Sequence, residues 1–360
     1  MAPLATSSLC TAPRPLRQAQ ACRGSRTLRT LRTLRTLMTA AEAAQQVLHA
    51  FKGQTRVRRQ VLDGHQLQKL SLTLNRPQLH PGLDVTEAPP PRGTPLPPGY
   101  HLAYFSPASL ESDLAADGTD RTFNPPAPFS RRMWAGGRMA WAPAAPPLRV
   151  GDEAEERTTL VAAAAKRSRD GSDMVLVDVD KEFWGPAGLA LVDRRAWVFR
   201  PPPTDALARS DAHVAGLVPG AVGRHSTVED VPPKHGSGTP HRRFRWSPVA
   251  LFRFSALTFN GHMIHYNEGW TRNVEGHPAT LVHGPLNLIA MMDYWRDVHG
   301  AAREPADIVY RALSPLYAGD EYVVRTESVR RASGTGDAWD IVVARNDTIN
   351  MRGTVSAGPC

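Results

Sequence analysis

Two short segments, Thr258–Tyr266 and His283–Leu286, carry residue types that could do chemistry. Their histidines could each move a proton, and one asparagine could hold a polar group by hydrogen bonds; these residues are His262, His265, His283 and Asn260. The pair Gly284-Pro285 could begin a helix, because proline suits the first helical position. A histidine can move a proton, and a nearby helix N-terminus can hold an oxyanion. Reactions at a thioester use both. This combination favours an enzyme that acts on an acyl group.

The spacing indicates how these groups would work together. Asn260 and His265 are separated by a turn that contains Gly261, so both side chains could face one pocket. A thioester carbonyl at the backbone N–H of Gly284 would be polarised by the helix end, which makes the neighbouring α-proton more acidic. His265 could then move a proton between that carbon and a departing hydroxyl held by Asn260. The predicted reaction is reversible removal of water from a 3-hydroxyacyl thioester.

Other residues near these segments have two readings. His283 either takes part in the site or only caps the turn before the helix, and Tyr266 either lines the pocket or packs in the core. Arg131 and Arg132 could contact the phosphates of phosphopantetheine or coenzyme A, or form ordinary ion pairs at the surface. The remaining histidines, including His277 and His299, are expected at the surface.

Length and composition set the class of protein. The chain has 360 residues, of which 41% are hydrophobic and 21% charged, as is typical of a globular protein with one large core or two ordinary ones. It contains no apolar run of about 18 residues, so a membrane-spanning helix is not expected. The three cysteines are Cys10, Cys22 and Cys360, which exclude a disulfide framework and a thiolate zinc site in the body.

The formal net charge of +9 is concentrated at the N-terminus. Residues 1–41 contain seven arginines and no acidic residue, and the rest of the chain carries about +2. An arginine-rich, acid-free head is typical of a mitochondrial transit peptide, and a low-complexity tail without an address is the alternative. We therefore predict a disordered presequence over residues 1–41 and a matrix location. The nearly neutral body gives no reason to expect nucleic-acid binding.

The body contains an internal repeat. Pro147–Asp152 and Pro315–Asp320 share the pattern Pro-Leu-x-x-Gly-Asp at an offset of 168 residues, and strand-like alternation follows each copy. One helix is well marked, from Pro285 to Gly300, with an apolar stripe at helical spacing. Residues 40–72 also look helical. One helix wrapped by antiparallel strands is the outline of a hotdog fold, so we predict an α+β tandem double hotdog.

The predicted boundaries follow from this repeat. Residues 1–41 form the transit peptide, residues 42–200 an N-terminal, non-catalytic hotdog, and residues 244–360 a C-terminal, catalytic hotdog. Residues 201–243 between them are rich in proline and glycine and are expected to be a linker. Whether this pseudo-dimer pairs with a second copy is left open.

The segment Phe254–Tyr266, followed by His283–Leu286, resembles the tandem-hotdog, MaoC-like dehydratases. This family includes the mitochondrial 3-hydroxyacyl-thioester dehydratases type 2 and the mesaconyl-C4-CoA hydratases. Arg131–Met139 and Pro147–Asp152 resemble the non-catalytic copy of the same family. The resemblance extends over roughly residues 45–357, with motifs from both halves in the family's order.

In the wider group of R-specific enoyl-CoA hydratases the motif is Asp-x-Asn-x-x-His. Aligned on His265, this chain has Asn260 in place of the aspartate and His262 in place of the asparagine. The resemblance implies that His265 does most of the acid–base work, that Asn260 positions the substrate and that the N–H of Gly284 is the oxyanion donor. Asp293 and Glu268 are not expected to replace the missing carboxylate.

The resulting hypothesis is a hydro-lyase that converts a (3R)-3-hydroxyacyl thioester to the trans-2-enoyl form in mitochondrial type II fatty-acid synthesis. Its partner would be acyl carrier protein or an acyl-CoA, and the pantetheine arm belongs to that substrate. No metal or cofactor is implied, because the base, the amide and the helix end suffice. A mesaconyl-CoA-type hydratase and a non-catalytic acyl-binding hotdog are the alternatives; a thioesterase fits less well, since no acidic residue would activate water.

Overall fold

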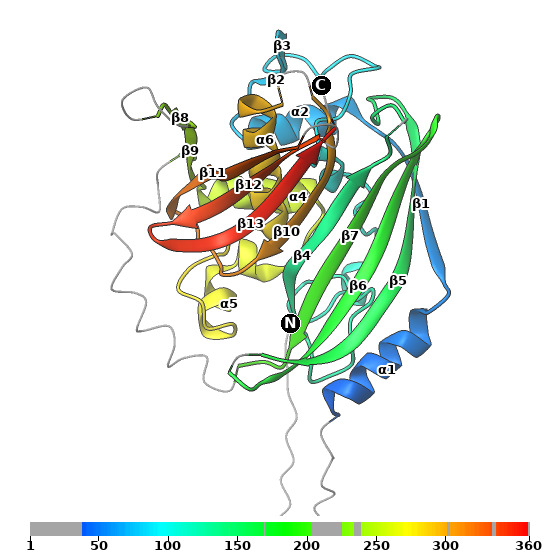
Figure 1. Ribbon diagram of the computed structural model, residues 1–360. Coiled ribbons are helices and arrows are strands. Elements are labelled where there is room, and N and C mark those ends of the chain that lie inside the picture. The colour runs from blue at the N-terminus through cyan, green and yellow to red at the C-terminus, as the bar shows by residue number, and fades with distance from the viewer. Residues whose placement is uncertain are drawn as a thin grey trace, which may run out of the picture. The chain divides into compact units, whose positions relative to one another are not determined.

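The computed structural model describes residues 38–358, except 144, 169, 204–224, 234–238, 301–302 and 333–335. Most of the predicted transit peptide, residues 1–37, lies outside the described residues. The described part of the chain forms one compact unit built around a continuous antiparallel sheet (Figure 1). No helix in this part is both long and apolar enough to cross a membrane.

The sheet has eleven strands among the described residues, and its order divides into two halves. The N-terminal half has the order β1 (Thr55–Val61), β5 (Glu153–Arg167), β6 (Asp173–Gly185), β7 (Gly188–Arg200) and β4 (Arg131–Trp141). The C-terminal half continues with β10 (Pro305–Ala312), β13 (Thr348–Ala357), β12 (Gly336–Arg345), β11 (Glu321–Ala332), β9 (His241–Arg245) and β8 (Thr227–Val231). The short strands β2 (Gln78–His80) and β3 (Leu83–Asp84) pair separately.

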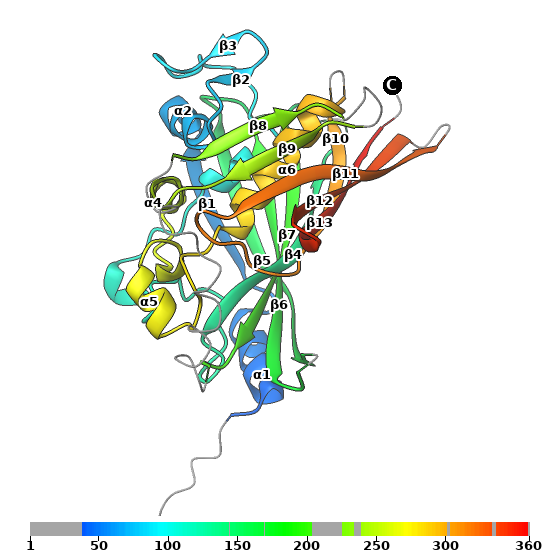
Figure 2. The same ribbon diagram turned by 90° about the vertical axis from the view of Figure 1, so that its left-hand side faces the viewer.

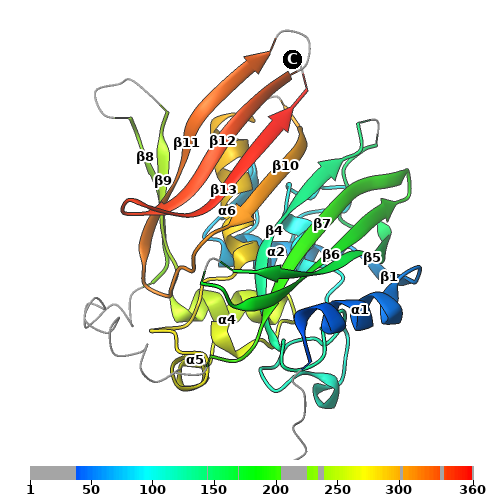
Figure 3. The same cartoon turned by 60° about the horizontal axis from the view of Figure 1, so that its bottom comes forward.

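The two halves mirror each other about the β4–β10 junction, as Figure 3 shows from below. The repeated hexapeptide forms the same turn in both copies. Asp152 Oδ2 accepts the N–H of Arg149 at 2.8 Å, and Asp320 Oδ2 accepts the N–H of Tyr317 at 2.9 Å. In each copy the preceding glycine has a positive φ, +85° and +86°, a conformation that glycine adopts without strain. Each turn leads into a long strand, so the predicted double hotdog is confirmed at the level of local geometry.

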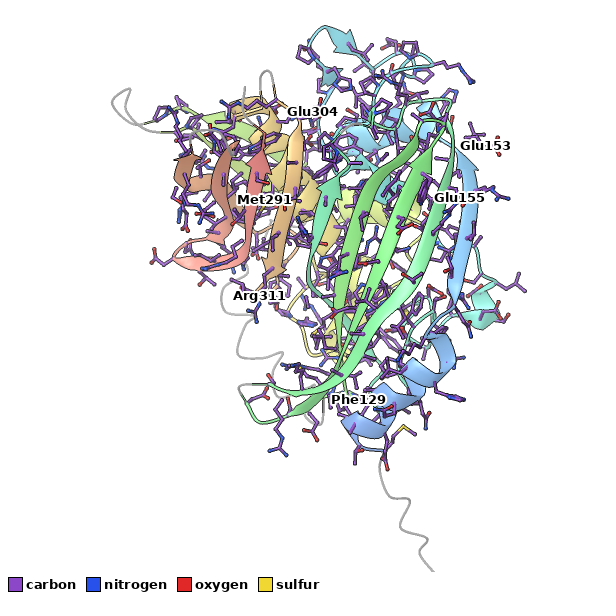
Figure 4. All side chains as sticks on the ribbon, turned by 45° about the vertical axis from the view of Figure 1, so that its right-hand side comes forward. Phe129, Glu153, Glu155, Met291, Glu304 and Arg311 are labelled. Atoms are coloured by element: carbon purple, nitrogen blue, oxygen red, sulfur yellow. The ribbon has the colours of Figure 1, made fainter. Side chains whose placement is uncertain are left out.

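The C-terminal half wraps the predicted helix, α6 (Gly284–Val298). Pro285 lies in its first turn, and the side chains of the predicted stripe, including Leu288, Met291 and Trp295, are fully buried. The helix packs against β11, β12 and β13. It lies behind the sheet in Figure 1 and beside β12 and β13 in Figure 2. Met291 reaches β13 at Gly353, where an added Cβ would lie 2.6 Å from the methionine sulfur (Figure 4). This contact fixes the height of the helix above the sheet.

In the part of the N-terminal half that the structure describes, no helix corresponds to α6. The repeat offset places the expected counterpart at residues 116–130, which form turns and irregular backbone. Two elements cover part of the same sheet face instead. Helix α1 (Ala40–Phe51) packs on the start of β6 at Val175, and the 3-10 helix η1 (Tyr100–Ala103) packs near its end at Phe183. The space between them is the origin of the large cavity described below.

Two local predictions were wrong. Residues 40–72 form not one helical region but α1 and α2 (Gly64–Thr73) with β1 between them, because β1 supplies an edge strand that pairs with β5 over its whole length. The proposed linker 201–243 contains β8 and the start of β9, which pair with each other and extend the sheet beyond β11. The other short elements are η2 (Glu111–Asp113), α4 (Pro248–Leu257), η4 (Met263–His265) and α5 (Glu268–Asn273).

Strand β4 requires glycine where it lies between β7 and β10 at the junction of the two halves. A Cβ added at Gly137 would lie 2.1 Å from the carbonyl oxygen of Arg194 and 2.7 Å from the hydroxyl of Tyr310. We expect Gly137→Ala to lower the free energy of unfolding by about 1–3 kcal/mol, as overpacking in a tight interior does. Urea denaturation measures this change. The matched control is Gly269→Ala on exposed α5, where the nearest atom is 3.6 Å away and the stability should stay within about 0.5 kcal/mol. Equal effects of the two substitutions would contradict the role of the junction.

Candidate active site

A bend after α4 brings the predicted site residues together. The backbone passes through a positive φ of +48° at Phe259, and the N–H of Asn260 then donates to the carbonyl of Ser255 at 2.8 Å. The side-chain oxygen of Asn260 accepts the N–H of His262 at 3.2 Å. The turn is thus closed by hydrogen bonds at both of its ends. The chain then enters η4, whose last residue is His265.

His265 is buried and its tautomer is fixed. Its Nδ1 lies 2.9 Å from the carbonyl oxygen of Leu281, so Nδ1 carries the proton and donates it. The opposite ring nitrogen, Nε2, therefore keeps its lone pair. Burial lowers the pKa of His265 to about 4, against which the carbonyl contact acts only weakly. His265 is consequently a neutral imidazole with one free basic nitrogen at physiological pH.

His283 stacks on His265 with ring centroids 3.6 Å apart. It occupies the N-cap position of α6 but makes no side-chain cap hydrogen bond, so it does not simply cap the helix. Its Nε2 lies 2.8 Å from the hydroxyl of Ser255, while Nδ1 is buried with no hydrogen-bond partner among the described residues. Burial first, and then the neighbouring His265 and His262, hold the pKa of His283 well below its ordinary value.

His262 completes a group of three histidines. Its ring meets that of His265 edge-on at 5.4 Å, and its Nε2 lies 3.5 Å from Oδ2 of Asp117. Burial lowers the pKa of His262 well below the ordinary value, and the charges of His265, Arg132 and Arg131 add to this effect. All three imidazoles are thus neutral near pH 7.

Gly284 is the first residue of α6, directly after His283. A Cβ at this position would lie 3.1 Å from the Trp134 ring, which reaches across from β4 in the N-terminal half. Glycine therefore lets the tryptophan close over the start of the helix. The N–H groups at a helix N-terminus have no intrahelical partners and can bind an anion or a developing oxyanion.

These groups line one cavity of about 1420 Å³ that draws on both halves of the chain. Asn260, Gly284 and the three histidines contribute to its wall. Tyr266 also lines it, is 44% exposed and donates its hydroxyl hydrogen to the carbonyl of Gly261 at 2.8 Å. The tyrosine therefore lies at the wall of the cavity and not in the core. The structure brings every sequence-predicted site residue to this single cavity.

The two predicted arginines differ. Arg131 forms an ion pair with Glu275. Arg132 stacks its guanidinium over Trp197 at 5.3 Å and donates to the backbone carbonyl of Asp120 at 3.2 Å. No carboxylate within the described residues forms an ion pair with Arg132, although its guanidinium is largely buried in the cavity wall. Arg131 is thus ion-paired, as the alternative reading had it, and both arginines line the cavity.

Two histidines that were expected to be solvated at the surface are partly buried. His277 lines the cavity, its Nδ1 lies 3.3 Å from the Tyr317 hydroxyl, and burial lowers its pKa to about 4. His299 lies at the end of α6, with its Nε2 2.7 Å from the hydroxyl of Thr326.

The N-terminal wall of the cavity is rich in charge. Lys181 on β6 is buried against Glu156 at 2.9 Å, and burial lowers the pKa of its ammonium to about 8. Around the whole cavity the lining includes ten arginines and lysines but only four acidic residues. The excess of positive charge suits an anionic ligand. Among the described residues, no three His, Cys, Asp or Glu side chains are arranged to hold a metal ion.

Comparison with known proteins agrees with this geometry. The model of the family "hydroxyacyl-thioester dehydratase type 2" matches residues 99–318, more than half of the chain. The chain belongs to this family. It is therefore a hydro-lyase, a hydroxyacyl-thioester dehydratase or hydratase, and the resemblance seen in the sequence is confirmed.

Two curated proteins show the range of the relatives. A mesaconyl-C(4)-CoA hydratase from Chloroflexus aurantiacus is 32% identical over 237 residues, which cover 65% of this chain and 76% of that protein. The mitochondrial hydroxyacyl-thioester dehydratase type 2 of Schizosaccharomyces pombe is 25% identical over 256 residues, or 68% of this chain and 80% of that protein.

Solved structures share the fold. A MaoC-like dehydratase from Phytophthora capsici covers 88% of this chain and 99% of its own, with a TM-score of 0.55 at 13% identity. HtdX from Mycobacterium tuberculosis covers 84% of this chain and 99% of its own, with a TM-score of 0.50 at 15% identity. At these identities the likeness concerns the fold alone.

Sequence reasoning missed several residues of the site. Ser255 precedes the motif by one helical turn, and its contact with His283 depends on a long-range approach. Asp117 and Trp134 come from the other half of the chain, and no local pattern places either of them at the site. The Gly284-Pro285 pair was a usable signal for Trp134, because a glycine at a helix start often permits a close neighbour.

The buried histidines predict how stability depends on pH. For His265 and His277 the folded-state pKa of about 4 lies below the ordinary value of 6.5, so the unfolded chain binds more protons between these values. The free energy of unfolding should therefore fall as the pH drops from 6.5 towards 4. Urea denaturation at a series of pH values measures this slope. His277→Gln should make it shallower, and His65→Gln, on the surface of α2, should leave it unchanged. A stability that is flat over this range would contradict the burial of neutral histidines.

Proposed function

We propose that this protein removes water from a (3R)-3-hydroxyacyl thioester to give the trans-2-enoyl thioester. One observation carries the proposal: a neutral imidazole with a free Nε2, His265, lines the same cavity as the N-terminus of α6. The first can accept a proton from C2 and the second can stabilise the thioester oxygen as charge develops there. Both requirements of the reaction are met by residues that come within one cavity.

The proposed steps assign one task to each group. The thioester carbonyl accepts a hydrogen bond from the N–H of Gly284, which acidifies the protons on C2. His265 Nε2 takes one of these protons and passes it to the hydroxyl on C3, which leaves as water while the C2–C3 double bond forms. Asn260 holds that hydroxyl by a hydrogen bond. Trp134 covers the helix start and keeps bulk water from the enolate-like intermediate.

We place this reaction in mitochondrial type II fatty-acid synthesis. The Schizosaccharomyces pombe relative is named as mitochondrial, and the arginine-rich, acid-free residues 1–41 have the composition of an import signal. The carrier is acyl carrier protein or coenzyme A, both of which present the pantetheine arm on a phosphate. The positive excess of the cavity lining supports an anionic carrier of this kind.

His265→Ala should abolish most of the activity. A positioned acid–base group contributes about 10²–10⁴-fold to the rate, so kcat should fall by that factor while the protein stays folded. Loss of the enoyl absorbance of crotonyl-CoA on hydration measures the reverse reaction. The matched control is His299→Gln, which removes a histidine of α6 far from the cavity wall and should keep full activity. Wild-type turnover by a folded His265→Ala variant would contradict the assignment.

A second candidate concerns the acyl group. Arg132 presents a largely buried guanidinium beside the histidines without an ion-pair partner among the described residues. Burial lowers the pKa of this group, and the carboxylates of Asp120 and Asp117 act against the effect. A carboxylate on the substrate would satisfy such a guanidinium. This feature favours a hydratase of a dicarboxylyl-CoA, which is the substrate class in the name of the Chloroflexus relative.

Arg132→Met separates the two candidates. If the substrate carries a carboxylate, the variant should lose about tenfold or more in kcat/KM towards mesaconyl-CoA, since a charged hydrogen-bonded pair contributes about 1.5–3 kcal/mol. Its activity on crotonyl-CoA should change little. Steady-state kinetics with both thioesters measures the ratio. Equal losses on both substrates would argue against carboxylate recognition and for the fatty-acid substrate.

A further inference from the structure

The N-terminal half places a carboxylate against the candidate site. Oδ2 of Asp117 lies 3.5 Å from Nε2 of His262, and both side chains are only about a tenth exposed. In the C-terminal half, position 260 beside the histidines is an uncharged asparagine. Asp117 is therefore the carboxylate that directly faces one of the three histidines.

The backbone around Asp117 holds this carboxylate in place. Its other oxygen, Oδ1, accepts the N–H of Thr119 at 3.0 Å and the hydroxyl of Thr119 at 2.7 Å. Its own carbonyl accepts the N–H of Met263, the first residue of η4, at 2.8 Å. The carboxylate thus has one oxygen committed to its own loop and one oxygen directed at His262.

Two glycines allow the loops of the two halves to touch. A Cβ at Gly118 would lie 2.0 Å from the carbonyl oxygen of Gly261, and a Cβ at Gly261 would lie 2.7 Å from the carbonyl oxygen of Gly118. Any other residue at either position would push Asp117 away from His262. This close approach leads directly to the aspartate–histidine contact.

We propose that Asp117 is a positioning residue that fixes the tautomer of His262. In this arrangement the Nε2–H of His262 points to Asp117, and Nδ1 is left as an acceptor for the hydroxyl on C3 of the substrate. The inference rests on the proposed dehydration. It adds that the N-terminal half, which was predicted from the sequence to be non-catalytic, contributes a residue to the site. Contacts of this kind are often long without substrate and tighten in the complex.

The charges around His262 explain why orientation, and not proton transfer, is its role. His265, Arg131, Arg132 and His277 all act against a positive charge on this ring, and burial acts in the same direction. The carboxylate of Asp117 therefore faces a neutral ring. In the reaction His265 Nε2 takes the C2 proton, the C2–H electron pair forms the double bond, and the C3 hydroxyl leaves as water with that proton. His262 only holds the hydroxyl in line.

A double-mutant cycle tests the proposal. Asp117→Asn keeps the size of the side chain but can donate to Nε2 and so permit the other tautomer. We expect kcat for crotonyl-CoA hydration to fall about tenfold to a hundredfold with little change in KM, a part of what a positioned acid–base site contributes. In a His262→Ala background, the same substitution should cost nothing further. An equal loss in both backgrounds would overturn the proposal.

Two further measurements separate orientation from loop structure. Thr119→Val removes one hydrogen bond to Asp117 Oδ1 but leaves Oδ2 free, so kcat should stay within about twofold. A loss as large as that of Asp117→Asn would show a structural role only.

Nitrogen chemical shifts of His262 report the tautomer without any substrate. The wild type should carry the proton on Nε2 and Asp117→Asn should not. This readout is independent of turnover, so a wild type with the expected tautomer but no dehydration would contradict the proposed function and not the contact. Protonation on Nδ1 in the wild type would overturn the contact itself.

Discussion

The pairing of β4 with β10 is the interaction on which the site depends. It joins the two halves edge to edge from Gly136 opposite Arg311 to Ala140 opposite Asp307, and the Arg138–Asp307 ion pair crosses the same seam. Glycine at 136 and 137 lets the strands and the Tyr310 ring approach closely, because a Cβ at either position would overlap backbone oxygen atoms. Once the seam is formed, β4 brings Trp134 over the start of α6, and the loop before β4 reaches the turn before η4. A shift of one residue in this register would turn Trp134 to the opposite face of the sheet.

In the described part of the N-terminal half, no helix like α6 covers the sheet face, and this leaves room for the cavity. In the C-terminal half α6 fills the sheet face with fully buried apolar side chains. In the N-terminal half the equivalent residues 116–130 form turns, and the same face is left partly open between α1 and η1. Polar and charged side chains occupy the opening, among them Lys181 and Glu156, which form an ion pair with each other. One copy of the repeat thus provides the helix end and the histidines, and the other provides space and charge.

The sequence predicted what is local. The motif around His265, the glycine–proline start of α6 and the repeated Pro-Leu-x-x-Gly-Asp turn each have a physical meaning within a few residues, and the structure has the helix and the turns where they were expected. The features that were not predicted share a different cause. Strand β1 was read as helix because its partner β5 lies about 100 residues away, and Asp117, Trp134 and the buried position of His277 depend on contacts between the halves. Contacts between residues so far apart in the chain leave no periodic signal in a single sequence. The roles proposed for Asn260 and Gly284 remain proposals that the geometry supports.

The asparagine at position 260 has a physical reason in the crowded environment of the histidines. His265 stacks on His283 and meets His262 edge-on. A proton on His262 would be repelled by His265 and by the arginines of β4, and a proton on His283 by the other two rings. A carboxylate at position 260 would add a negative charge that favours the protonated form of a nearby imidazole. An amide holds the same turn by its oxygen without adding charge. The carboxylate that the site does contain, Asp117, faces His262 on the N-terminal side, opposite a ring that serves on the proposed mechanism only to orient the substrate. In this way His265, which must accept a proton, stays neutral, and His262, which must keep its orientation, is held by the carboxylate of Asp117.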